Sequence, residues 1–359
     1  MRIAPAAPPA ASVAAYPDPP PDGARVRPFF HPHLVNQPWA DPGLHVELLF
    51  ERRSLLFDAG DLRALAPRKI LRVSDVFISH AHMDHFMGFD WLLRICLGRD
   101  KKVRLFGPPG FLDQVEHKLA AYSWNLARNY VTDFGLTVAE FHPDGSARSA
   151  CFSCHGGFRR AHETILYTAD RILIDEPAFR VRAAFLDHKI PCLAFALEEK
   201  THVNIWRNRL AELGVAVGPW LKELKHAVLR GAADDSLVTA PRADATGTLC
   251  LPLGLFKTHA LRIVPGEKLC YVTDCAYHPA NVERIIDLAR DSDVLFIEAM
   301  FLEEDRDHAA AKSHLTARQA GEIARAAGAR KVIPFHFSAR YSGCYELLQA
   351  ELDEACRGG

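Results

Sequence analysis

The six residues HAHMDH, at positions 80–85, restrict the possible folds of this chain more than any other stretch does. They follow VSDVFI (73–78), which predicts a short buried strand, and precede FMGFDWLLRICLG (86–98), whose apolar spacing predicts a helix that stops near Gly98. The cluster is therefore predicted to lie on a strand-to-helix turn. Imidazole and carboxylate ligands together favour Zn²⁺, or in some sites Fe or Mn. A histidine-rich loop without metal is the alternative, which the tight spacing disfavours.

The spacing within this cluster suits two ions side by side. His80 and His82 alternate, so their side chains can project the same way from an extended loop, whereas Asp84 and His85 are adjacent and point elsewhere. Two ions about 3.5–4 Å apart can clamp a reacting phosphate or carbonyl group. The pattern therefore predicts a two-metal hydrolase centre.

Strand-like and helix-like segments alternate along most of the chain, which predicts a layered α/β fold. Strands are expected at 44–50, 54–58, 73–78, 103–106, 164–174, 179–187, 191–198, 268–274, 293–299 and 331–336, and helices at 86–98, 111–126, 279–290 and 316–327. The first two strands are expected to form a hairpin.

Polar residues recur at the ends of these predicted strands. His80, Asp274 and His336 each close an apolar strand, Glu298 lies near the end of another, and His188 follows FRVRAAFLD. Carboxyl ends of strands in α/β sheets commonly form one edge, where sites are built. We therefore expect these five side chains to meet.

Several sequence blocks resemble a known family. HAHMDH looks like the signature of the metallo-β-lactamase fold, an αββα sandwich of two sheets. Five further blocks are similar to those of ribonuclease Z, the endonuclease that processes tRNA 3′ ends: FLDHKIPCLAFALEEK (185–200), VTDC (272–275), FIEAMF (296–301), SHLTARQAGEIA (313–324) and PFHFSARY (334–341). The resemblance extends from about residue 44 to residue 345.

The resemblance implies a ligand set for two zinc ions, with Mn²⁺ or Fe²⁺ as alternatives. One ion would be held by His80, His82 and His188, and the other by Asp84, His85 and His336, with Asp274 as the bridging ligand. His155, in CFSCHGG, is the alternative to His188 as the third histidine of the first ion.

The resemblance also implies the catalytic roles. A metal-bridging hydroxide would attack the phosphodiester, and Asp84 would act as a base for the attacking water. His314 would donate a proton to the leaving oxygen and would be held in place by Glu298. This agrees with general chemistry, since a histidine near its own pKa can transfer protons and a carboxylate raises its basicity.

Residues 200–247 are polar and mixed, which predicts an inserted, arm-like surface segment. Within it, LGVAVGPWLKELKHA (213–227) is similar to the base of the exosite arm with which bacterial ribonuclease Z grips tRNA. The cations of this segment are Lys222, Lys225 and Arg230, and the residues expected to bind substrate are Lys222, Lys225 and, from PFHFSARY, Arg340. The family resemblance implies a homodimer in which one subunit's arm serves the other's site. A solvated amphipathic helix is the alternative for this segment.

The N-terminal part of the match departs from the family. Residues 29–46 do not match its glycine-rich turn, and the formal net charge of −1 gives no global basic field to attract nucleic acid. The predicted substrate is a tRNA precursor. Hydrolysis of a small phosphodiester such as a cyclic nucleotide, or other metallo-hydrolase chemistry, is the alternative, and a non-catalytic binding protein is the third hypothesis.

Amino-acid composition predicts the domain boundaries and the cellular compartment. The first 28 residues contain eight prolines and predict a disordered tail, and residues 29–359 are expected to form one hydrolase domain with its insertion. Nine scattered cysteines suit a reducing compartment, and no run of eighteen apolar residues occurs, so no membrane partner and a cytoplasmic location are expected.

Overall fold

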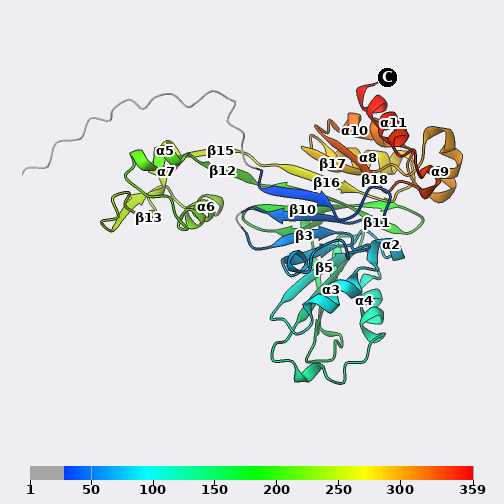
Figure 1. The fold of residues 1–359 in the computed structure, drawn as a ribbon, viewed down its shortest axis with the longest axis horizontal. Helices are drawn as coiled ribbons and strands as arrows, with labels where there is room; N and C mark the ends of the chain where they lie inside the picture. The colour runs from blue at the N-terminus through cyan, green and yellow to red at the C-terminus, as the bar shows by residue number, and fades with distance from the viewer. Residues whose placement is uncertain (1–27, 50, 359) are drawn as a thin grey trace, which may run out of the picture.

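The fold is a sandwich of two β-sheets with helices on both outer faces (Figure 1). A computed structural model describes residues 28–49 and 51–358, so the predicted disordered tail lies outside the described residues except for Pro28. The first sheet has eight strands in the order β1 to β8, and the second has six in the order β18-β17-β16-β11-β10-β9. The predicted αββα sandwich is confirmed.

The strands and helices of the sandwich have the following bounds. The first sheet contains β1 (Phe30–Leu34), β2 (Leu44–Leu48), β3 (Ser54–Phe57), β4 (Val73–Phe77), β5 (Lys102–Gly107), β6 (Gly135–Phe141), β7 (Ser146–Ser153) and β8 (Ala161–Tyr167). The second contains β9 (Ile172–Asp175), β10 (Phe179–Asp187), β11 (Pro191–Glu199), β16 (Lys268–Val272), β17 (Val294–Glu298) and β18 (Val332–Phe335). The helices are α1 (Pro67–Ile70), α2 (Met83–Phe86), α3 (Phe89–Cys96), α4 (Phe111–Ala120), α8 (Pro279–Ala289), α9 (Arg306–Lys312), α10 (Ala317–Ala327) and α11 (Glu346–Arg357).

Three hydrophobic cores separate the four layers. One packs α1 to α4 on the first sheet, and another packs α8 to α11 on the second. The core between the sheets is rich in aromatic rings, with the Phe57 ring centroid 4.8 Å from that of Phe77 and 5.6 Å from that of Phe195 across the sandwich. Both faces of each central strand are therefore buried, which explains why these strands read as continuous apolar runs.

Strand direction brings the predicted site residues to one edge. β3 runs parallel to β4, and β16, β17 and β18 are mutually parallel. β10 runs in the same direction as β16, because each is antiparallel to β11. The carboxyl ends of the parallel strands in each sheet thus share an edge, as the strand-end pattern predicted.

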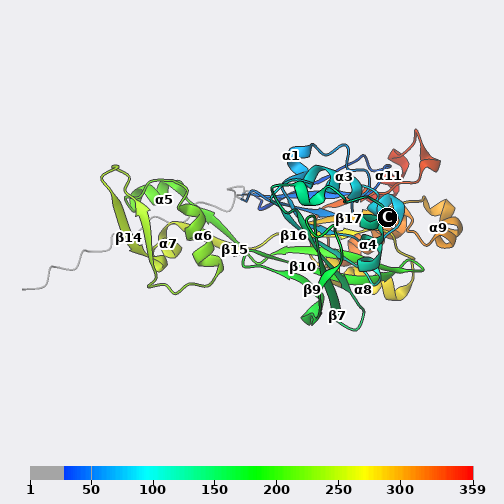
Figure 2. The same cartoon turned by 90° about the horizontal axis from the view of Figure 1, so that it is seen from below.

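A separate small lobe is inserted between β11 and β16. It consists of β12 (Thr201–Ile205), α5 (Arg207–Glu212), α6 (Leu221–Leu229), β13 (Leu237–Pro241), β14 (Thr248–Pro252), α7 (Leu253–His259) and β15 (Leu261–Pro265), and it has its own core. Antiparallel pairing of β12 with β15 joins it to the sandwich (Figures 1 and 2). The inserted segment therefore ends near Pro265 rather than at residue 247 as predicted.

Two predicted helices differ from the observed ones. The expected helix at 86–98 is divided into α2 and α3 at Gly88, where a Cβ would lie 1.9 Å from the Gly60 carbonyl oxygen, so the chain approaches too closely for a side chain. The expected helix at 111–126 ends at Ala120, and the Trp124 indole N–H donates to the Leu119 carbonyl, one of the acceptors that the end of a helix leaves open.

One predicted strand, 164–174, is two strands in different sheets. β8 belongs to the first sheet and β9 to the second, and the chain crosses between them through Asp170 and Arg171, both with positive φ. The strands β1, β6 and β7 were not predicted. The hairpin of β2 and β3 is confirmed.

Across residues 28–49 and 51–358, no helix is long and apolar enough to cross a bilayer. The cytoplasmic location stays a prediction.

Candidate metal centre

Nine predicted site residues converge at the shared strand edge. His80 follows β4, and Asp84 and His85 lie on α2 directly after it, while His188, Asp274 and His336 follow β10, β16 and β18. Ligand atoms of these residues fall into three groups, in each of which they lie within 4.8 Å of one another: His80, His82, His188 and Asp274; Asp84, His85 and His336; and Asp274, Glu298, His314 and His336. The structure therefore brings together every residue predicted to bind metal or to catalyse.

Asp274 lies at the middle of the cluster. One of its oxygens, Oδ2, is 3.7 Å from His80 Nε2 and 3.5 Å from His188 Nε2. The other, Oδ1, is 3.4 Å from His85 Nε2 and 2.9 Å from His336 Nδ1. Each carboxylate oxygen thus faces one of the two predicted ligand sets, which is the arrangement expected of a bridging ligand.

Asp84 completes the second set. Its Oδ2 lies 3.4 Å from His85 Nε2 and 3.3 Å from His336 Nε2, and its side chain is 43% exposed. An exposed carboxylate beside buried imidazoles can contact both an ion and the solvent from which a nucleophilic water would come.

Neighbouring groups orient two of the histidine rings so that Nε2 faces the cluster. His85 Nδ1 lies 2.9 Å from Asp58 Oδ2, and His188 Nδ1 lies 2.9 Å from the Ser313 carbonyl oxygen. Asp58 is itself fully buried and accepts hydrogen bonds from the Ser79 hydroxyl and from the Tyr271 hydroxyl, each at 2.9 Å. Such partners fix the tautomer and raise the basicity of metal-binding imidazoles.

Unpaired nitrogen atoms give a test of whether the residues fit a metal ion. His80 Nε2, His85 Nε2 and His336 Nδ1 are buried and make no well-aligned hydrogen bond in the described part of the chain, although His336 Nδ1 lies 2.9 Å from Asp274 Oδ1. Leaving a buried polar atom unpaired costs about 1–3 kcal/mol. Because these three nitrogens all face carboxylates of the cluster, bound cations would satisfy them, and the donor set fits metal binding.

The pKa values show how strongly the cluster attracts positive charge. Burial raises the pKa of Asp274, but the His336 and His85 rings outweigh burial and hold that pKa well below its usual value. Burial lowers the pKa of His336, but Asp274 outweighs this effect and raises the pKa to about 10. The His80 pKa is lowered, chiefly by burial and then by the His85 ring. The Asp274 carboxylate therefore stays ionised and favours positive charge beside it, either on the His336 ring or on a metal cation.

His314 and Glu298 form a pair at the side of this cluster. His314 Nδ1 lies 2.9 Å from Glu298 Oε2 and 3.9 Å from Asp274 Oδ2. The other Glu298 oxygen, Oε1, accepts from the backbone N–H groups of Cys275 at 2.9 Å and Leu315 at 3.3 Å. Burial lowers the pKa of His314, but Glu298 outweighs burial, and the net pKa lies above the usual 6.5. The Glu298 carboxylate therefore favours the protonated form of His314.

The loop that carries His314 is fixed by a helix cap. Thr316 begins α10 with a capping box, in which its side chain accepts from the Gln319 N–H and the Gln319 side chain accepts from the Thr316 N–H. Ser313, with positive φ, ends α9 one residue before His314. The SHLTARQ sequence thus sets the chain direction on both sides of the histidine.

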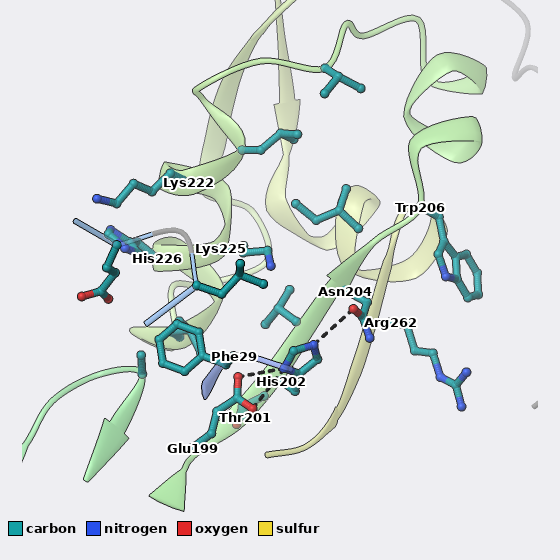
Figure 3. Close-up of a pocket in the computed structure, with 18 of the residues that line it drawn as sticks. Phe29, Glu199, Thr201, His202, Asn204, Trp206, Lys222, Lys225, His226 and Arg262 are labelled. Carbon is teal, nitrogen blue, oxygen red and sulfur yellow. Dashed lines mark hydrogen bonds and ion pairs between the residues drawn. The ribbon is translucent and has the colours of Figure 1, made fainter. Parts of the chain in front are cut away.

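The three predicted substrate-binding cations lie outside the cluster. Arg340 is exposed and pairs with Asp305, with Nη1 3.2 Å from Oδ1. Lys222 and Lys225 are on α6 and line a pocket of about 790 Å³ between the lobe and the sandwich (Figure 3). Figure 3 shows Lys225 directed toward the His202 side of this pocket and Lys222 directed away from it. Burial lowers the Lys225 pKa, whereas Lys222 is exposed and free to approach a phosphate.

His155, the alternative third histidine, does not join any of these groups in the described part of the chain. It follows β7, and its Nε2 lies 2.9 Å from the Tyr130 carbonyl oxygen.

Asp58 and Tyr271 were not predicted as site residues. A signal for Asp58 existed, since it directly follows the strand in LLFDAGD (55–61), much as the predicted metal ligands follow theirs.

Comparisons with known proteins agree with this arrangement. The profile described as the metallo-beta-lactamase superfamily matches residues 41–120, and that described as a beta-lactamase superfamily domain matches residues 252–337. A ribonuclease Z of Deinococcus radiodurans is 31% identical over 301 residues, which cover 82% of this chain and 86% of the relative. A ribonuclease Z of Methanothermobacter thermautotrophicus is 27% identical over 307 residues, with 82% and 80% covered.

Solved structures share the fold. The metallo-beta-lactamase fold protein YhfI from Bacillus subtilis superposes with a TM-score of 0.50 and 16% identity, covering 88% of this chain and 86% of that protein. The short form of human tRNase Z superposes with a TM-score of 0.50 and 21% identity, covering 87% of this chain and 93% of that protein. At these identities the similarity establishes the shared fold.

Proposed function

The chain belongs to the ribonuclease Z family of metallo-β-lactamase-fold proteins, and from this premise we propose that it is a metal-dependent endonuclease that processes the 3′ ends of tRNA precursors. The observation that carries the proposal is the His314–Glu298 pair beside the Asp274 cluster. A metal cluster alone fits many hydrolases. A buried histidine whose pKa is raised by a paired carboxylate next to the cluster fits cleavage of a bond whose leaving group is an unactivated ribose oxygen.

The cluster would hold two metal ions. His80, His82 and His188 would bind one ion, and a second set of Asp84, His85 and His336 would bind the other, with Asp274 shared. Imidazole and carboxylate ligands favour Zn²⁺, and Mn²⁺ or Fe²⁺ would accept the same donors. When bound, such ions supply a nucleophile from water at neutral pH and stabilise negative charge on phosphoryl oxygens.

The protein's own groups would handle the protons. Asp84, half-exposed at the cluster, would orient the attacking water and accept its proton. His314, held through Nδ1 by Glu298, would give a proton from Nε2 to the 3′ oxygen as the P–O bond breaks. Together these two transfers balance the hydrolysis, since one proton leaves the water and one reaches the leaving group.

The inserted lobe would bind the body of the tRNA. It lies at the left of the molecule in both views, whereas α9, which precedes His314, lies at the right (Figures 1 and 2). Within one chain the lobe therefore extends away from the cluster. We infer a homodimer in which the lobe of one subunit, with the exposed Lys222, approaches tRNA bound at the other subunit's site. The reaction would take place in the cytoplasm.

A paired substrate assay tests the function. Metal-loaded protein should cleave a 3′-extended tRNA precursor and should also hydrolyse bis-p-nitrophenyl phosphate, and two metal ions should be bound per chain. Cleavage of cyclic nucleotides without cleavage of the tRNA precursor would refute the tRNA substrate. An intact, metal-loaded protein inactive on all three compounds would refute phosphodiester hydrolysis itself. Sedimentation of the same sample as a monomer would refute the inferred dimer.

A further inference from the structure

A second group of metal-binding residue types lies on the first hairpin of the sandwich, apart from the catalytic cluster. β1 and β2 pair in antiparallel register, with His33 opposite His45 and His31 opposite Glu47. Side chains alternate between the faces of a strand, so these four residues share one face, while Phe30 and Val46 point into the core between the sheets. The register thus places an HxH sequence directly against an HxE sequence.

The distances within this group match those of a metal site. Ligand atoms of His33, His45 and Glu47 all lie within 4.8 Å of one another. His33 Nε2 and His45 Nδ1 are 3.1 Å apart. A tetrahedral zinc ion with Zn–N distances of about 2.0–2.1 Å requires its two nitrogens to be about 3.3 Å apart. A shift of a few tenths of an ångström would therefore admit an ion between the two rings.

The surroundings of His45 prepare it as a ligand. Its side chain is fully buried, and its Nε2 lies 2.8 Å from the Ser54 hydroxyl, which fixes the ring with Nδ1 toward His33. A partner of this kind on the far nitrogen is typical of metal-binding histidines. Glu47 is half-buried at the rim of the group and leaves an approach from solvent.

The group already holds a cation that belongs to the chain. Lys69, from α1, places Nζ 2.7 Å from Glu47 Oε1 and 3.3 Å from His33 Nε2. The ammonium therefore occupies the position between the carboxylate and the imidazole where a metal ion would bind. Because the lysine side chain is long and half-exposed, it can withdraw into solvent when another cation takes its place.

We propose that His33, His45 and Glu47 form a binding site for a zinc-class divalent metal ion, which displaces the Lys69 ammonium. Two imidazoles and one carboxylate are a common protein donor set for Zn²⁺, and a water molecule completes four-coordination. The site is separate from the catalytic cluster and does not depend on the proposed function.

An ion at this site would stiffen a loop that reaches the catalytic cluster. Residues 35–43 connect β1 to β2, and they bond to backbone beside the cluster: Gly60 N–H donates to the Pro42 carbonyl at 3.0 Å, and Phe337 N–H donates to the Pro38 carbonyl at 2.9 Å. Phe337 follows His336 directly. A metal ion at the base of this loop would therefore restrain the loop and, through the Phe337–Pro38 hydrogen bond, the position of His336.

Metal counting across matched variants tests the proposal. Zinc-saturated wild type should hold one more ion per chain than either His33→Ala or Glu47→Gln, whatever number the catalytic cluster binds. Lys69→Met should bind this extra ion at least tenfold more tightly, because the competing ammonium is gone. Lys118→Met is the matched control, since it removes a different ion-paired lysine, bonded to Asp90, and should leave the extra ion's affinity unchanged.

Two results would overturn the proposal. The first is an equal metal count in wild type, Lys69→Met and His33→Ala at saturating Zn²⁺. The second is an extra ion that persists in Glu47→Gln and His33→Ala with unchanged affinity. Thermal unfolding of each variant without added zinc establishes that it is folded, and zinc should raise the unfolding temperature of Lys69→Met more than that of His33→Ala.

Discussion

The Glu298→Gln variant isolates the contribution of the proton donor. Gln keeps the shape of Glu298 and can still accept the backbone N–H groups of Cys275 and Leu315 through its amide oxygen. What it loses is the negative charge 2.9 Å from His314 Nδ1. The variant therefore removes the charge and the acceptor beside one histidine while leaving the two backbone hydrogen bonds in place.

The size of the effect follows from the pKa of His314. Glu298 raises this pKa above 6.5 against the opposing effect of burial. A nearby opposite charge shifts a pKa by about 1–3 units, so its removal should lower the His314 pKa below its ordinary value. With the protonated form of His314 then less favoured, the rate on a tRNA precursor should fall about 10–100-fold. The alkaline limb of the pH–rate profile should move to lower pH, since activity is lost as pH rises through the pKa of a required acid.

The assay compares two substrates over the same pH range. Cleavage of the tRNA precursor expels a ribose oxygen that needs a proton, whereas bis-p-nitrophenyl phosphate expels a stable phenolate that does not. Glu298→Gln should slow the first reaction and leave the second nearly unchanged, with metal content equal to wild type. Adding Glu298→Gln to His314→Ala should cause little further loss, because the two residues act as one unit. An equal loss on both substrates, or a loss of metal, would refute the assigned roles.

Three further outcomes are expected. Asp58→Asn should weaken metal retention about 10–100-fold after dialysis against a chelator, because His85 loses the carboxylate that orients it, and Tyr271→Phe should have a smaller effect. Lys222→Ala should lower the slope of log affinity for tRNA precursor against log salt by about one, measured by titration at several salt concentrations, without changing hydrolysis of the small ester. Phe57→Ala should reduce the free energy of unfolding in urea by about 3–5 kcal/mol, because the ring is buried against Phe77 and Phe195 between the sheets.

Local sequence predicted which of the cluster side chains meet, because most of them end strands. An apolar run of five or six residues can be recognised from the sequence alone, and a polar residue directly after it must emerge at the edge of the sheet. His188, Asp274 and His336 satisfy this pattern in three separate parts of the chain. Their meeting required only that the strands run parallel, which alternating helices and strands favour.

Features that depend on distant pairing were missed. The lobe ends where β15 pairs with β12, some sixty residues earlier in the chain, and no local pattern marks that partner. The crossing between sheets at Asp170 and Arg171 interrupts what reads as one apolar strand. The role of Asp58 depends on Tyr271, from the other sheet, whose hydroxyl reaches it across the sandwich. In each case the deciding contact joins segments that the sequence separates.

Asp274 joins the two halves of the sandwich through the cluster. His80 and His85 approach it from the first sheet, and His188 and His336 approach it from the second. Without metal, the charge of this buried carboxylate is balanced by protonated imidazoles, as the raised pKa of His336 indicates. Metal ions would replace those protons, so their affinity must fall as pH falls, and binding must draw both sheets onto the same carboxylate. The hydrophobic core packs the sheets together, and metal binding would add a contact between them through one carboxylate that residues from both sheets face.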